Sequence, residues 1–549
     1  MAIILGYDVG TSATKVTACD EAGVCLGWEQ AAYPLDQRVV GGAIWSEQDP
    51  EDWWRGACEA TQRLLKAKEL TSRTVRAIGL SGQMHGSVLL GADAAGSGGK
   101  ANVLGPALLW NDSRATKECE RLRELAGGEE GMVRLVGNAA REGFTLPKLL
   151  WLASNRPAMW KAARHLLLPK DYIAFRMTGA IATDVGDASG TLLFDVARRK
   201  WSLEACSLFG IDPELLPAAH ESTATVGELT SSAREALGIS TGKAPIPVII
   251  GSGDNQTGAV GEGVVTSGAG LCIIGTSGVL LAALATPQFD DGSCLTRPLN
   301  DAQPVADAAV ATGTGLSARS PANVGRLHTF CGAAGQDSWC MTGCTLSAGL
   351  ALRWARDCLM PGASYNDVMS ESWLAPAGCD GLLFFPYLMG ERCPFAEARA
   401  RGAWVGLNGS HRRCHLLRSV VEGVTFTLAQ IADIARGAGV GLDQIRGCGG
   451  GNRSLLWRQL QADVFGVPLS YPAAGGPASA EVDRGGAYGA AILAAVGSGL
   501  FDSVRQGCSS WTLSTEDVTL PSPAVDERLV EAARRHARAA AEYRGCWLS

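Results

Sequence analysis

The sequence predicts an α/β protein made of two related halves, on the basis of three observations. Apolar strand patterns alternate with glycine turns and helical patterns along the chain. Two predicted strands, residues 3–8 and 14–19, flank the triplet Gly10-Thr11-Ser12 as strands flank a hairpin turn. The same arrangement recurs at Gly275-Thr276-Ser277, 265 residues later in a chain of 549 residues, and so long a period excludes a solenoid.

The composition is that of a globular protein without strong electrostatic or membrane character. Hydrophobic residues make up 46% and charged residues 19%, and the net charge of −7 argues against a nucleic-acid partner. No apolar run approaches the ~18 residues of a membrane helix, and the N-terminus has no secretory pattern, so we expect a cytoplasmic protein. The 17 scattered cysteines are expected as reduced thiols, and no Cys/His spacing indicates a zinc site.

The most informative stretch is residues 247–265. Its β-branched run, residues 248–250, predicts a buried strand that ends in Gly251-Ser252-Gly253. Asp254 and Asn255 then stand at the tip, and a helix is expected from residue 256. Open α/β sheets place their chemistry where a strand delivers a side chain beside a helix N-terminus. Asp254 is therefore the first candidate for a catalytic residue.

The two Gly-Thr-Ser turns are candidate phosphate sites. Glycine permits close approach of the backbone, and N–H groups and hydroxyls in such a turn can surround a phosphate. For the first turn alone, which follows Asp8, an ordinary hairpin is the competing interpretation. The recurrence favours the phosphate interpretation, because two turns facing across a cleft could hold a nucleotide triphosphate from both sides.

Polar residues also follow two other predicted strands. Residues 75–80 lead to Met84 and to His85, which is either a substrate contact or a turn histidine bonded to backbone. Residues 107–110 lead to Asn111-Asp112-Ser113-Arg114, whose side chains could bind hydroxyls. A loop is expected over residues 183–191, where Asp184 and Asp187 are interpreted as ordinary turn residues.

A glycine turn in the second half is a candidate nucleoside site. A strand at residues 445–448 precedes Gly449-Gly450-Gly451, and a helix is expected from residue 455. Bare backbone there could carry a flat base or a ribose, and close packing of strand on helix is the alternative. Loops and edge strands are expected over residues 286–325. Further helices are expected at residues 412–436 and 490–499, with a solvated one at 524–543.

Taken together, these motifs resemble the FGGY carbohydrate kinase family over most of the chain. The resemblance rests on the motifs that follow: Asp8 to Ser12, Ser81 to Gly86, Leu109 to Asp112, Gly143 to Asn155, Gly253 to Asn255, Gly275 to Gly278, Pro386 to Arg392, Gly402 to Glu422, and Gly449 to Ser454. Several motifs in order at compatible spacings are a specific signal. Departures occur at residues 286–320, which match poorly, and at Cys340, which stands where the resemblance leads us to expect histidine.

The resemblance implies two actin-like ATPase domains of the ribonuclease H-like type, with a cleft between them. Residues 1–246 would bind the sugar and carry the first phosphate hairpin, and residues 247–549 would carry the catalytic base, the second hairpin and the adenosine site. It implies Asp254 as general base, with Asp8 orienting Mg²⁺ through water. The implied sugar contacts are Met84, His85, Asp254 and Asn255, and the implied ATP contacts are Asp8, Thr11, Ser12, Gly275, Thr276, Gly449, Gly450 and Ser454.

The activity implied is transfer of phosphate from MgATP to a sugar. Met84-His85-Gly86 favours D-xylulose, with D-xylulose 5-phosphate as product, because glycerol-phosphorylating relatives carry an Arg-Glu pair in that region. Another ketose or a polyol, such as ribulose, is the nearest alternative. A non-catalytic actin-fold nucleotide-binding protein is the alternative from another class. The expected partners are the sugar and ATP, without nucleic acid or membrane, and a homodimer is left open.

Overall fold

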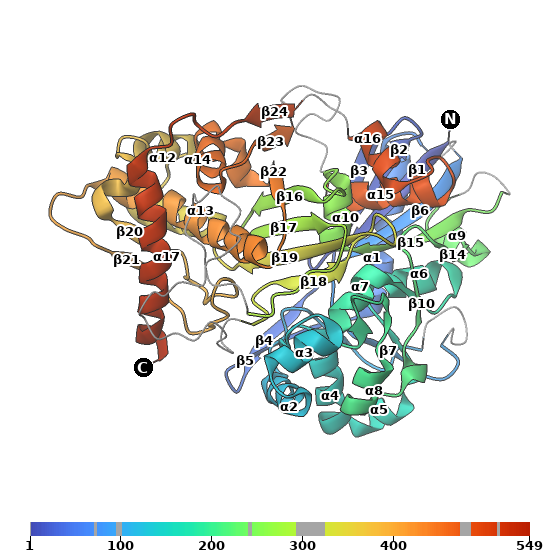
Figure 1. Cartoon of the computed structure of the whole chain (residues 1–549). Helices are drawn as coiled ribbons and strands as arrows, with labels where there is room; N and C mark the ends of the chain where they lie inside the picture. The colour runs from blue at the N-terminus through green and yellow to red at the C-terminus, as the bar shows by residue number, and fades with distance from the viewer. Residues whose placement is uncertain are drawn as a thin grey trace.

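Two β-sheets form the framework of the molecule (Figure 1). The computed structural model describes residues 2–70, 74–94, 102–239, 244–292, 324–472, 485–512 and 516–548. In this part of the chain no helix is long and apolar enough to cross a membrane. Most of the segment expected as loops, residues 286–325, lies outside the described residues.

The first sheet has six strands in the order β14-β15-β6-β1-β2-β3. Its strands are β1 (Ile3–Val9), β2 (Ala13–Asp20), β3 (Cys25–Ala32), β6 (Val75–Gly82), β14 (Thr225–Glu228) and β15 (Pro247–Gly253). The central strands β1, β6 and β15 run parallel and are buried almost throughout, which explains their continuous apolar sequences. Antiparallel pairing of β1 with β2 forms the predicted hairpin around Gly10-Thr11-Ser12.

The second sheet has seven strands in the order β18-β19-β17-β16-β22-β23-β24. Its strands are β16 (Gly268–Ile274), β17 (Gly278–Leu284), β18 (His328–Cys331), β19 (Trp339–Thr345), β22 (Leu442–Cys448), β23 (Leu469–Pro472) and β24 (Glu516–Thr519). Strand β16 pairs antiparallel with β17 and parallel with β22, as β1 pairs with β2 and β6. The predicted duplication is therefore confirmed at the level of strand topology.

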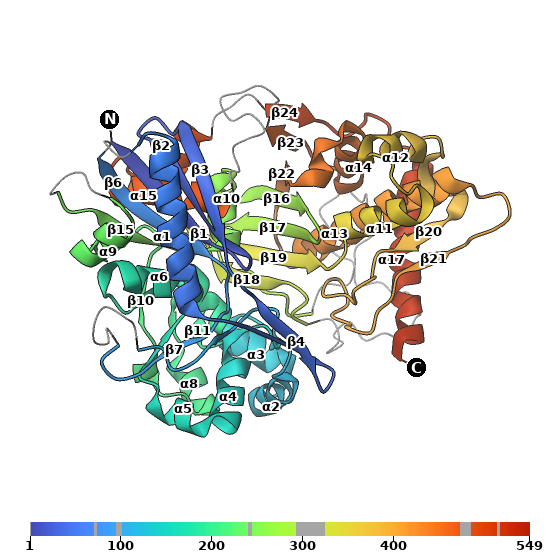
Figure 2. The ribbon, with the colours of Figure 1, turned by 180° about the vertical axis from the view of Figure 1, so that it is seen from behind.

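Helices cover both sheets, and the long ones carry the cores. On the first sheet, α1 (Pro50–Ala67) packs against β2 and β3 and is seen in front of them in Figure 2. On the face toward the second sheet lie α10 (Asp254–Gly261) and α15 (Gly486–Gly497) (Figure 1). The buried helix α13 (Arg413–Gly437) fills the core of the second half, as its apolar sequence predicts.

The other elements complete the two halves. The remaining helices are α2 (Thr116–Ala126), α3 (Glu129–Val136), α4 (Thr145–Asn155), α5 (Pro157–Ala162), α6 (Pro169–Thr178), α7 (Val185–Ala188), α8 (Leu203–Phe209), α9 (Ser231–Ala236), α11 (Gly349–Leu359), α12 (Tyr365–Ser372), α14 (Leu455–Phe465), α16 (Val504–Trp511) and α17 (Glu527–Leu548). The small sheets contain β4 (Asp36–Val40), β5 (Ala43–Gln48), β7 (Val88–Leu90), β8 (Ala107–Leu108), β9 (His165–Leu167), β10 (Ala182–Asp184), β11 (Phe194–Asp195), β12 (Lys200–Trp201), β13 (Ala218–His220), β20 (Leu383–Phe385) and β21 (Ala403–Val405).

Helix α15 lies unusually close to the first sheet, because the facing residues have no side chains. A Cβ atom on Gly6 would lie 1.9 Å from the carbonyl oxygen of Ala487, and one on Gly79 would lie 2.0 Å from that of Ala490. The last third of the chain thus returns to the first sheet. The expectation of a packed helix at residues 490–499 is confirmed, although the helix begins four residues earlier.

Three predicted details differ in the structure. The helix expected from residue 256 begins at Asp254, directly after β15, which ends at Gly253 as predicted although Gly251 adopts φ 67° at an irregularity in the pairing with β6. Residues 183–191 are not a loop, because they hold the end of β10, α7 and a 3₁₀ turn. Helix α17 is solvated on one face only, since Leu529, His536 and Ala540 on its other face are buried.

Sheet membership also bears on the expected division at residue 247. Strand β15 begins at that residue, yet it pairs with β6 and β14 in the first sheet. Helix α10 follows it and packs on α15 and β15. We therefore propose that the first domain extends to Gly261, because a boundary at residue 247 would cut between hydrogen-bonded strands of one sheet.

Candidate active site

The candidate site lies at the carboxyl edge of β1, β6 and β15. In the parallel pairing, Asp8 is opposite Ser81, Ser81 is opposite Ser252, and Gly253 is opposite Gly82. Parallel strands end at a common edge, so Asp8 and the residue after Gly253 reach the same place. That residue is Asp254, the first residue of α10.

A chain of hydrogen bonds fixes this edge. The Ser81 hydroxyl lies 3.0 Å from Asp8 Oδ1, to which it donates, and 2.6 Å from the Thr257 hydroxyl. With the Ser81 proton on Asp8, the single proton of Thr257 Oγ1 is shared between Ser81 and the carbonyl oxygen of Gly253, which lies 3.0 Å away. Buried hydroxyl groups thus join the first phosphate turn, strand β6 and the start of α10. These contacts fix the position of Asp8 relative to Asp254.

The carboxyl group of Asp254 is held in an environment that disfavours its charge. Burial and the nearby carboxylate of Asp8 raise its pKa to about 7, against a smaller lowering by the backbone N–H of Asn255. The residue is only partly shielded from solvent, so a bound molecule could reach it. A carboxyl group that changes its charge near neutral pH suits proton transfer.

Two of the expected sugar contacts lie directly beside this group. The amide nitrogen of Asn255 is 3.7 Å from the sulfur of Met84, which is buried. The structure therefore brings Met84, Asn255 and Asp254 together from β6 and α10. Gln256 follows on α10 with a 2% exposed side chain, and its amide has no hydrogen bond among the described residues. Our sequence reasoning missed Gln256, although it directly follows Asp254-Asn255.

His85 is held in one orientation and in its neutral form. Its Nδ1 lies 2.9 Å from the carbonyl oxygen of Gly190, so Nδ1 carries the proton and Nε2 is left as an acceptor. The ring contacts Phe144, with 4.5 Å between centroids. Burial first, and then the charge of Lys148, lower the pKa of His85 to about 3. The backbone bond expected for a turn histidine is present, and it leaves Nε2 available to a hydroxyl donor.

The first phosphate turn contributes fewer hydroxyls than expected. Thr11 Oγ1 donates to Gln83 at 3.1 Å and accepts from the indole nitrogen of Trp110 at 2.9 Å. Its hydroxyl is therefore committed to neighbouring side chains, and its backbone N–H is the group left for a phosphate. Ser12 is exposed at the tip of the turn.

The second phosphate turn lies against the start of α11. The backbone nitrogens of Ala348 and Leu350 donate to the carbonyl of Thr276 at 3.0 and 3.1 Å, and that of Gly349 donates to Gly275 at 2.8 Å. The Thr276 side chain is exposed. The turn is thus rigidly held from behind while its tip faces outward.

The glycine turn after β22 adjoins the second phosphate turn. A Cβ atom on Gly449 would lie 2.7 Å from the carbonyl oxygen of Ile274, the residue before Gly275. Gly450 has no atom within 4 Å of its Cβ position, so this glycine faces open space. Ser454 caps α14 by accepting a hydrogen bond from Trp457 N at 3.4 Å. Close packing explains Gly449, whereas Gly450 is open to a ligand.

A buried cluster of charged side chains lies next to the site. It shows that the interpretation of Asp184 and Asp187 as ordinary turn residues is wrong. Lys170 Nζ lies 2.8 Å from Asp184 and 3.6 Å from Asp187, and it also contacts Asp171. All four side chains are fully buried. Burial alone would lower the pKa of Lys170, but the three carboxylates hold it above its usual value. Turn residues at the surface would have none of these contacts.

Asp184 connects this cluster to both sides of the site. Its carboxylate accepts a hydrogen bond from the Ser252 hydroxyl at 2.6 Å, two residues before Asp254. It also accepts from the backbone of Gly186 at 2.8 Å and so caps α7, which leads to Gly190 and its bond to His85. One buried carboxylate therefore positions the strand that precedes Asp254 and the segment that holds His85.

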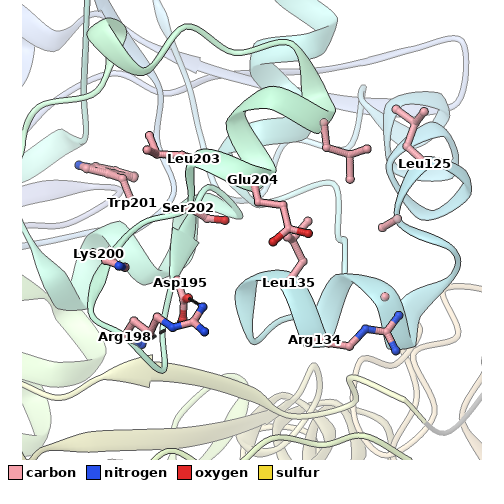
Figure 3. A pocket seen from close by; sticks show the side chains of 13 residues that line it. Leu125, Arg134, Leu135, Asp195, Arg198, Lys200, Trp201, Ser202, Leu203 and Glu204 are labelled. Carbon is pink, nitrogen blue, oxygen red and sulfur yellow. Dashed lines mark hydrogen bonds and ion pairs between the residues drawn. The ribbon is translucent and has the colours of Figure 1, made fainter.

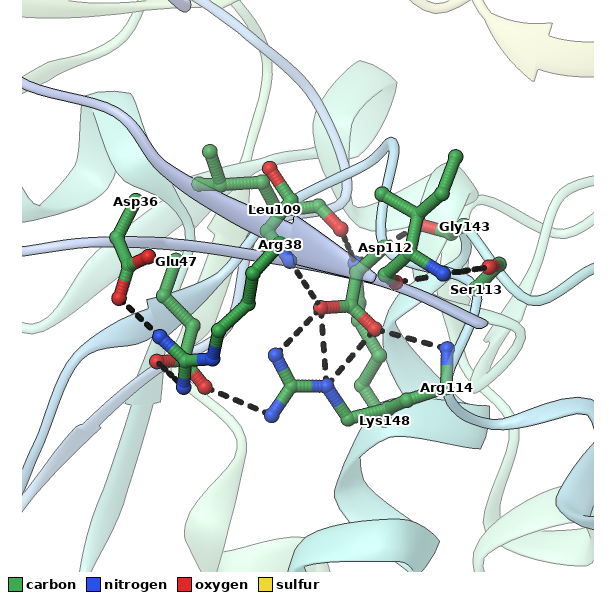
Figure 4. Close-up of polar contacts among 11 residues, drawn as sticks. Asp36, Arg38, Glu47, Leu109, Asp112, Ser113, Arg114, Gly143 and Lys148 are labelled. Carbon is green, nitrogen blue, oxygen red and sulfur yellow. Dashed lines mark hydrogen bonds and ion pairs between the residues drawn. The ribbon is translucent and has the colours of Figure 1, made fainter. Parts of the chain in front are cut away.

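A second buried network explains the residues that follow β8 (Figure 4). Arg114 pairs with Asp112 at 2.6 Å and with Glu47 at 2.7 Å, so these side chains do not bind hydroxyls as expected. Lys148 donates to the carbonyls of Leu109 and Gly143 at 2.9 and 2.8 Å, and burial lowers its pKa to about 7. Of the predicted polar tip, Asn111 keeps an amide oxygen with no hydrogen bond among the described residues.

The carboxylate of Asp8 suits a hydrated cation that is bound together with phosphate groups. Mg²⁺ typically takes one or two protein carboxylates plus substrate phosphates and water. Asp8, the residue expected to orient Mg²⁺, provides such a carboxylate beside the first turn. In the described residues, no group of three or more His, Cys, Asp or Glu side chains could form a dedicated metal cage.

A separate hollow lies away from these residues (Figure 3). It has a volume of about 670 Å³ and is formed by the end of α2, by α3 and α8, and by the β11–β12 hairpin. Arg134, Asp195 and Leu203 are among its lining residues, and none of the predicted site residues contributes. Asp254 is not among its lining residues.

Comparison with known proteins gives a consistent result. Models of the FGGY family of carbohydrate kinases match residues 3–261 with the N-terminal domain and residues 270–498 with the C-terminal domain. A xylulose kinase of Bacillus subtilis is 35% identical over 92% of this chain and 90% of that protein. The xylulose kinase of Escherichia coli is 36% identical over 90% of this chain and 89% of that protein.

Solved structures share the fold over nearly the whole chain. One described as a xyloylose kinase from Brucella ovis superposes with a TM-score of 0.82 at 30% identity, covering 99% of this chain and all of that one. A gluconate kinase from Lactobacillus acidophilus has a TM-score of 0.82 at 24% identity over 99% of this chain and 98% of that one, which shows a common fold alone.

We predict that Asp184→Asn destabilises the protein by about 3 kcal/mol, because it leaves Lys170 less compensated in a buried cluster. Urea denaturation followed by circular dichroism measures this. Asp195→Asn is the matched control, since its partner Arg198 is 74% exposed and such a pair contributes less than about 1 kcal/mol. Equal effects of the two substitutions would contradict a structural role for the cluster.

Proposed function

We propose that this chain, which belongs to the FGGY family of carbohydrate kinases, phosphorylates D-xylulose to D-xylulose 5-phosphate, with Asp254 as general base. Family membership makes the chain an ATP-dependent carbohydrate kinase. The observation that carries the assignment of the base is the common edge where Asp254, Asp8 of the first phosphate turn and the Met84–Asn255 contact meet. The substrate rests on the names of the relatives and on the Met84-His85 motif.

In the proposed reaction the sugar hydroxyl lies between Asp254 and the γ-phosphorus of ATP. The hydroxyl oxygen forms a bond to phosphorus while the bond from phosphorus to the β,γ-bridging oxygen breaks and ADP leaves. The proton of the hydroxyl passes to the carboxylate of Asp254. His85 Nε2 and the amide of Asn255 would orient the sugar through other hydroxyls. Mg²⁺, oriented by Asp8, would neutralise phosphate charge.

The two glycine turns would place the triphosphate. Backbone N–H groups of Thr11 and Ser12 would meet it from one half, and that of Thr276 from the other, since the N–H of Gly275 already donates to the carbonyl of Ser277 at 3.0 Å. Gly450, which has open space above it, would lie under the nucleoside next to the second turn. Positioning and charge neutralisation of this kind account for most of phosphoryl-transfer catalysis.

A panel of sugars tests the substrate in a coupled assay of ADP release, with and without Mg²⁺. We expect kcat/KM for D-xylulose to exceed that for D-ribulose, glycerol and D-gluconate by at least about tenfold, since one well-placed polar contact gives discrimination of this size. A higher kcat/KM for another sugar would contradict D-xylulose as the substrate and assign that sugar instead, within the same family. ATP consumption that ignores every sugar would favour a nucleotide-binding protein without kinase activity.

Asp254→Asn tests the base. Removing it is expected to lower kcat by about 10²–10⁴-fold, the usual contribution of a general base, while ATP binding measured by calorimetry stays within about threefold. Asp502→Asn is the control, because Asp502 is exposed and its carboxylate makes no contact among the described residues. Turnover near that of the wild type in Asp254→Asn would refute the role of the base.

The pH dependence of kcat/KM tests the same group in another way. Asp254 acts only when ionised, so kcat/KM should fall as the pH drops through about 7, the raised pKa of its carboxyl. His85→Asn should lower kcat/KM without moving this midpoint, because the pKa of His85, about 3, lies outside the range. A midpoint near pH 4 in the wild type would contradict the environment described for Asp254.

A further inference from the structure

Arg392 is an exposed cation of the second half that reaches the site of the first half. Its guanidinium carbon lies 5.7 Å from the centre of the Trp110 ring. Among the described residues, no hydrogen bond or ion pair involves this guanidinium group, although it offers five N–H donors. The neighbouring Arg399, by contrast, pairs with Glu397 at 3.3 Å.

The backbone of Arg392 is fixed to the second phosphate turn. The buried carboxylate of Glu391 accepts hydrogen bonds from the Thr345 hydroxyl at 2.6 Å, from Leu346 N at 3.1 Å and from Arg392 N at 2.7 Å. Thr345 pairs with Gly278, the residue that follows the second Gly-Thr-Ser triplet. The backbone of Arg392 is therefore held in a fixed position relative to the second phosphate turn.

The side chain of Arg392 is directed toward the first phosphate turn. Trp110, which it overlies, donates its indole N–H to the Thr11 hydroxyl at 2.9 Å. The charge of Arg392 also adds to the effects of burial and of Lys148 that lower the pKa of His85, so it acts within electrostatic reach of the expected sugar contact. Arg392 is thus connected to the first turn through Trp110 and to the second through Glu391, within electrostatic reach of His85.

A purely structural role would be a cation–π contact that joins the two halves. Such a contact needs only the face of the guanidinium and leaves its N–H donors unused. The planar fork of arginine matches the oxygens of a phosphate group, and Arg392 is connected to both candidate phosphate turns, through Trp110 and through Glu391. The geometry favours a ligand that carries those oxygens.

We propose that Arg392 is a further catalytic residue, which binds oxygens of the phosphoryl group during its transfer. This inference rests on the proposed function. As the sugar oxygen bonds to phosphorus and the bridging oxygen leaves with ADP, negative charge is spread over the equatorial and leaving oxygens. The guanidinium of Arg392, delivered by the second half, stabilises that charge, while Asp254 of the opposite wall takes the proton.

The test compares Arg392→Ala and Arg392→Lys with the wild type in the ADP-release assay with D-xylulose and MgATP. We expect kcat to fall about 10²–10³-fold in Arg392→Ala, with KM for the sugar changed less than about threefold, because the contact is made mainly in the transition state. Arg392→Lys keeps the charge and loses the fork, so its kcat should fall between the two.

Chemical rescue separates a catalytic from a structural role. Guanidinium chloride at low millimolar concentration should raise kcat of Arg392→Ala at least about tenfold, whereas the wild type and Arg399→Ala, the control from the same loop, should not respond. Circular dichroism verifies folding of each variant, and Arg392→Lys carries the test if Arg392→Ala does not fold. An Arg392→Ala kcat within about threefold of the wild type, or an Arg392→Lys kcat equal to it, would overturn the inference.

Different results would contradict the proposed function and the role of Arg392. Wild-type protein that phosphorylates no sugar would overturn the proposed function, and the role of Arg392 with it. Wild-type turnover on D-xylulose together with a small loss in Arg392→Ala, or a loss that guanidinium does not rescue, would overturn the role of Arg392 alone.

Discussion

The parallel pairing of β1, β6 and β15 is the constraint on which the site depends. It brings Asp8 and Asp254, 246 residues apart in the sequence, to one partly buried edge, where the hydroxyls of Ser81 and Thr257 hold them in place. Burial first, and then the nearby carboxylate of Asp8, raise the pKa of Asp254. Under the proposed function, this shared environment would make Asp254 a proton acceptor near neutral pH and would let Asp8 orient a hydrated cation.

Polar groups inside the first half maintain this arrangement at an energetic cost. Lys170 and its aspartates are removed from water, and such a cluster is favourable only while its charges are matched. Asp184 connects that cluster to two parts of the site. It accepts hydrogen bonds from the strand that precedes Asp254 and from the start of α7, and α7 leads to Gly190, whose carbonyl holds His85. A core of apolar residues could stabilise the fold equally well but would not orient these two elements with respect to each other.

The second half repeats the strand topology of the first without repeating its chemistry. Its hairpin is held by hydrogen bonds from α11, and its glycine turn lies beside that hairpin. Its loop at Glu391 places the side chain of Arg392 over Trp110 of the first half. The duplicated framework thus provides two similar walls, and the differences between them lie in the loops. The proposed base on the first wall and the proposed cation, Arg392, on the second would suit a reaction in which a proton and negative charge move in opposite directions.

The sequence by itself determined the local elements and the motifs. The β-branched run before Asp254, the repeated Gly-Thr-Ser turns and the strand before Gly449 were predictable, because period, turn chemistry and glycine are local signals. Only the tertiary structure decided which groups share an environment. Asp184 and Asp187 look like turn residues until Lys170 is placed beside them, the Thr11 hydroxyl is taken by Gln83 and Trp110, and β15 joins the first sheet across the expected boundary. Burial, pairing of charges and strand order arise from contacts between distant segments, which no local pattern encodes.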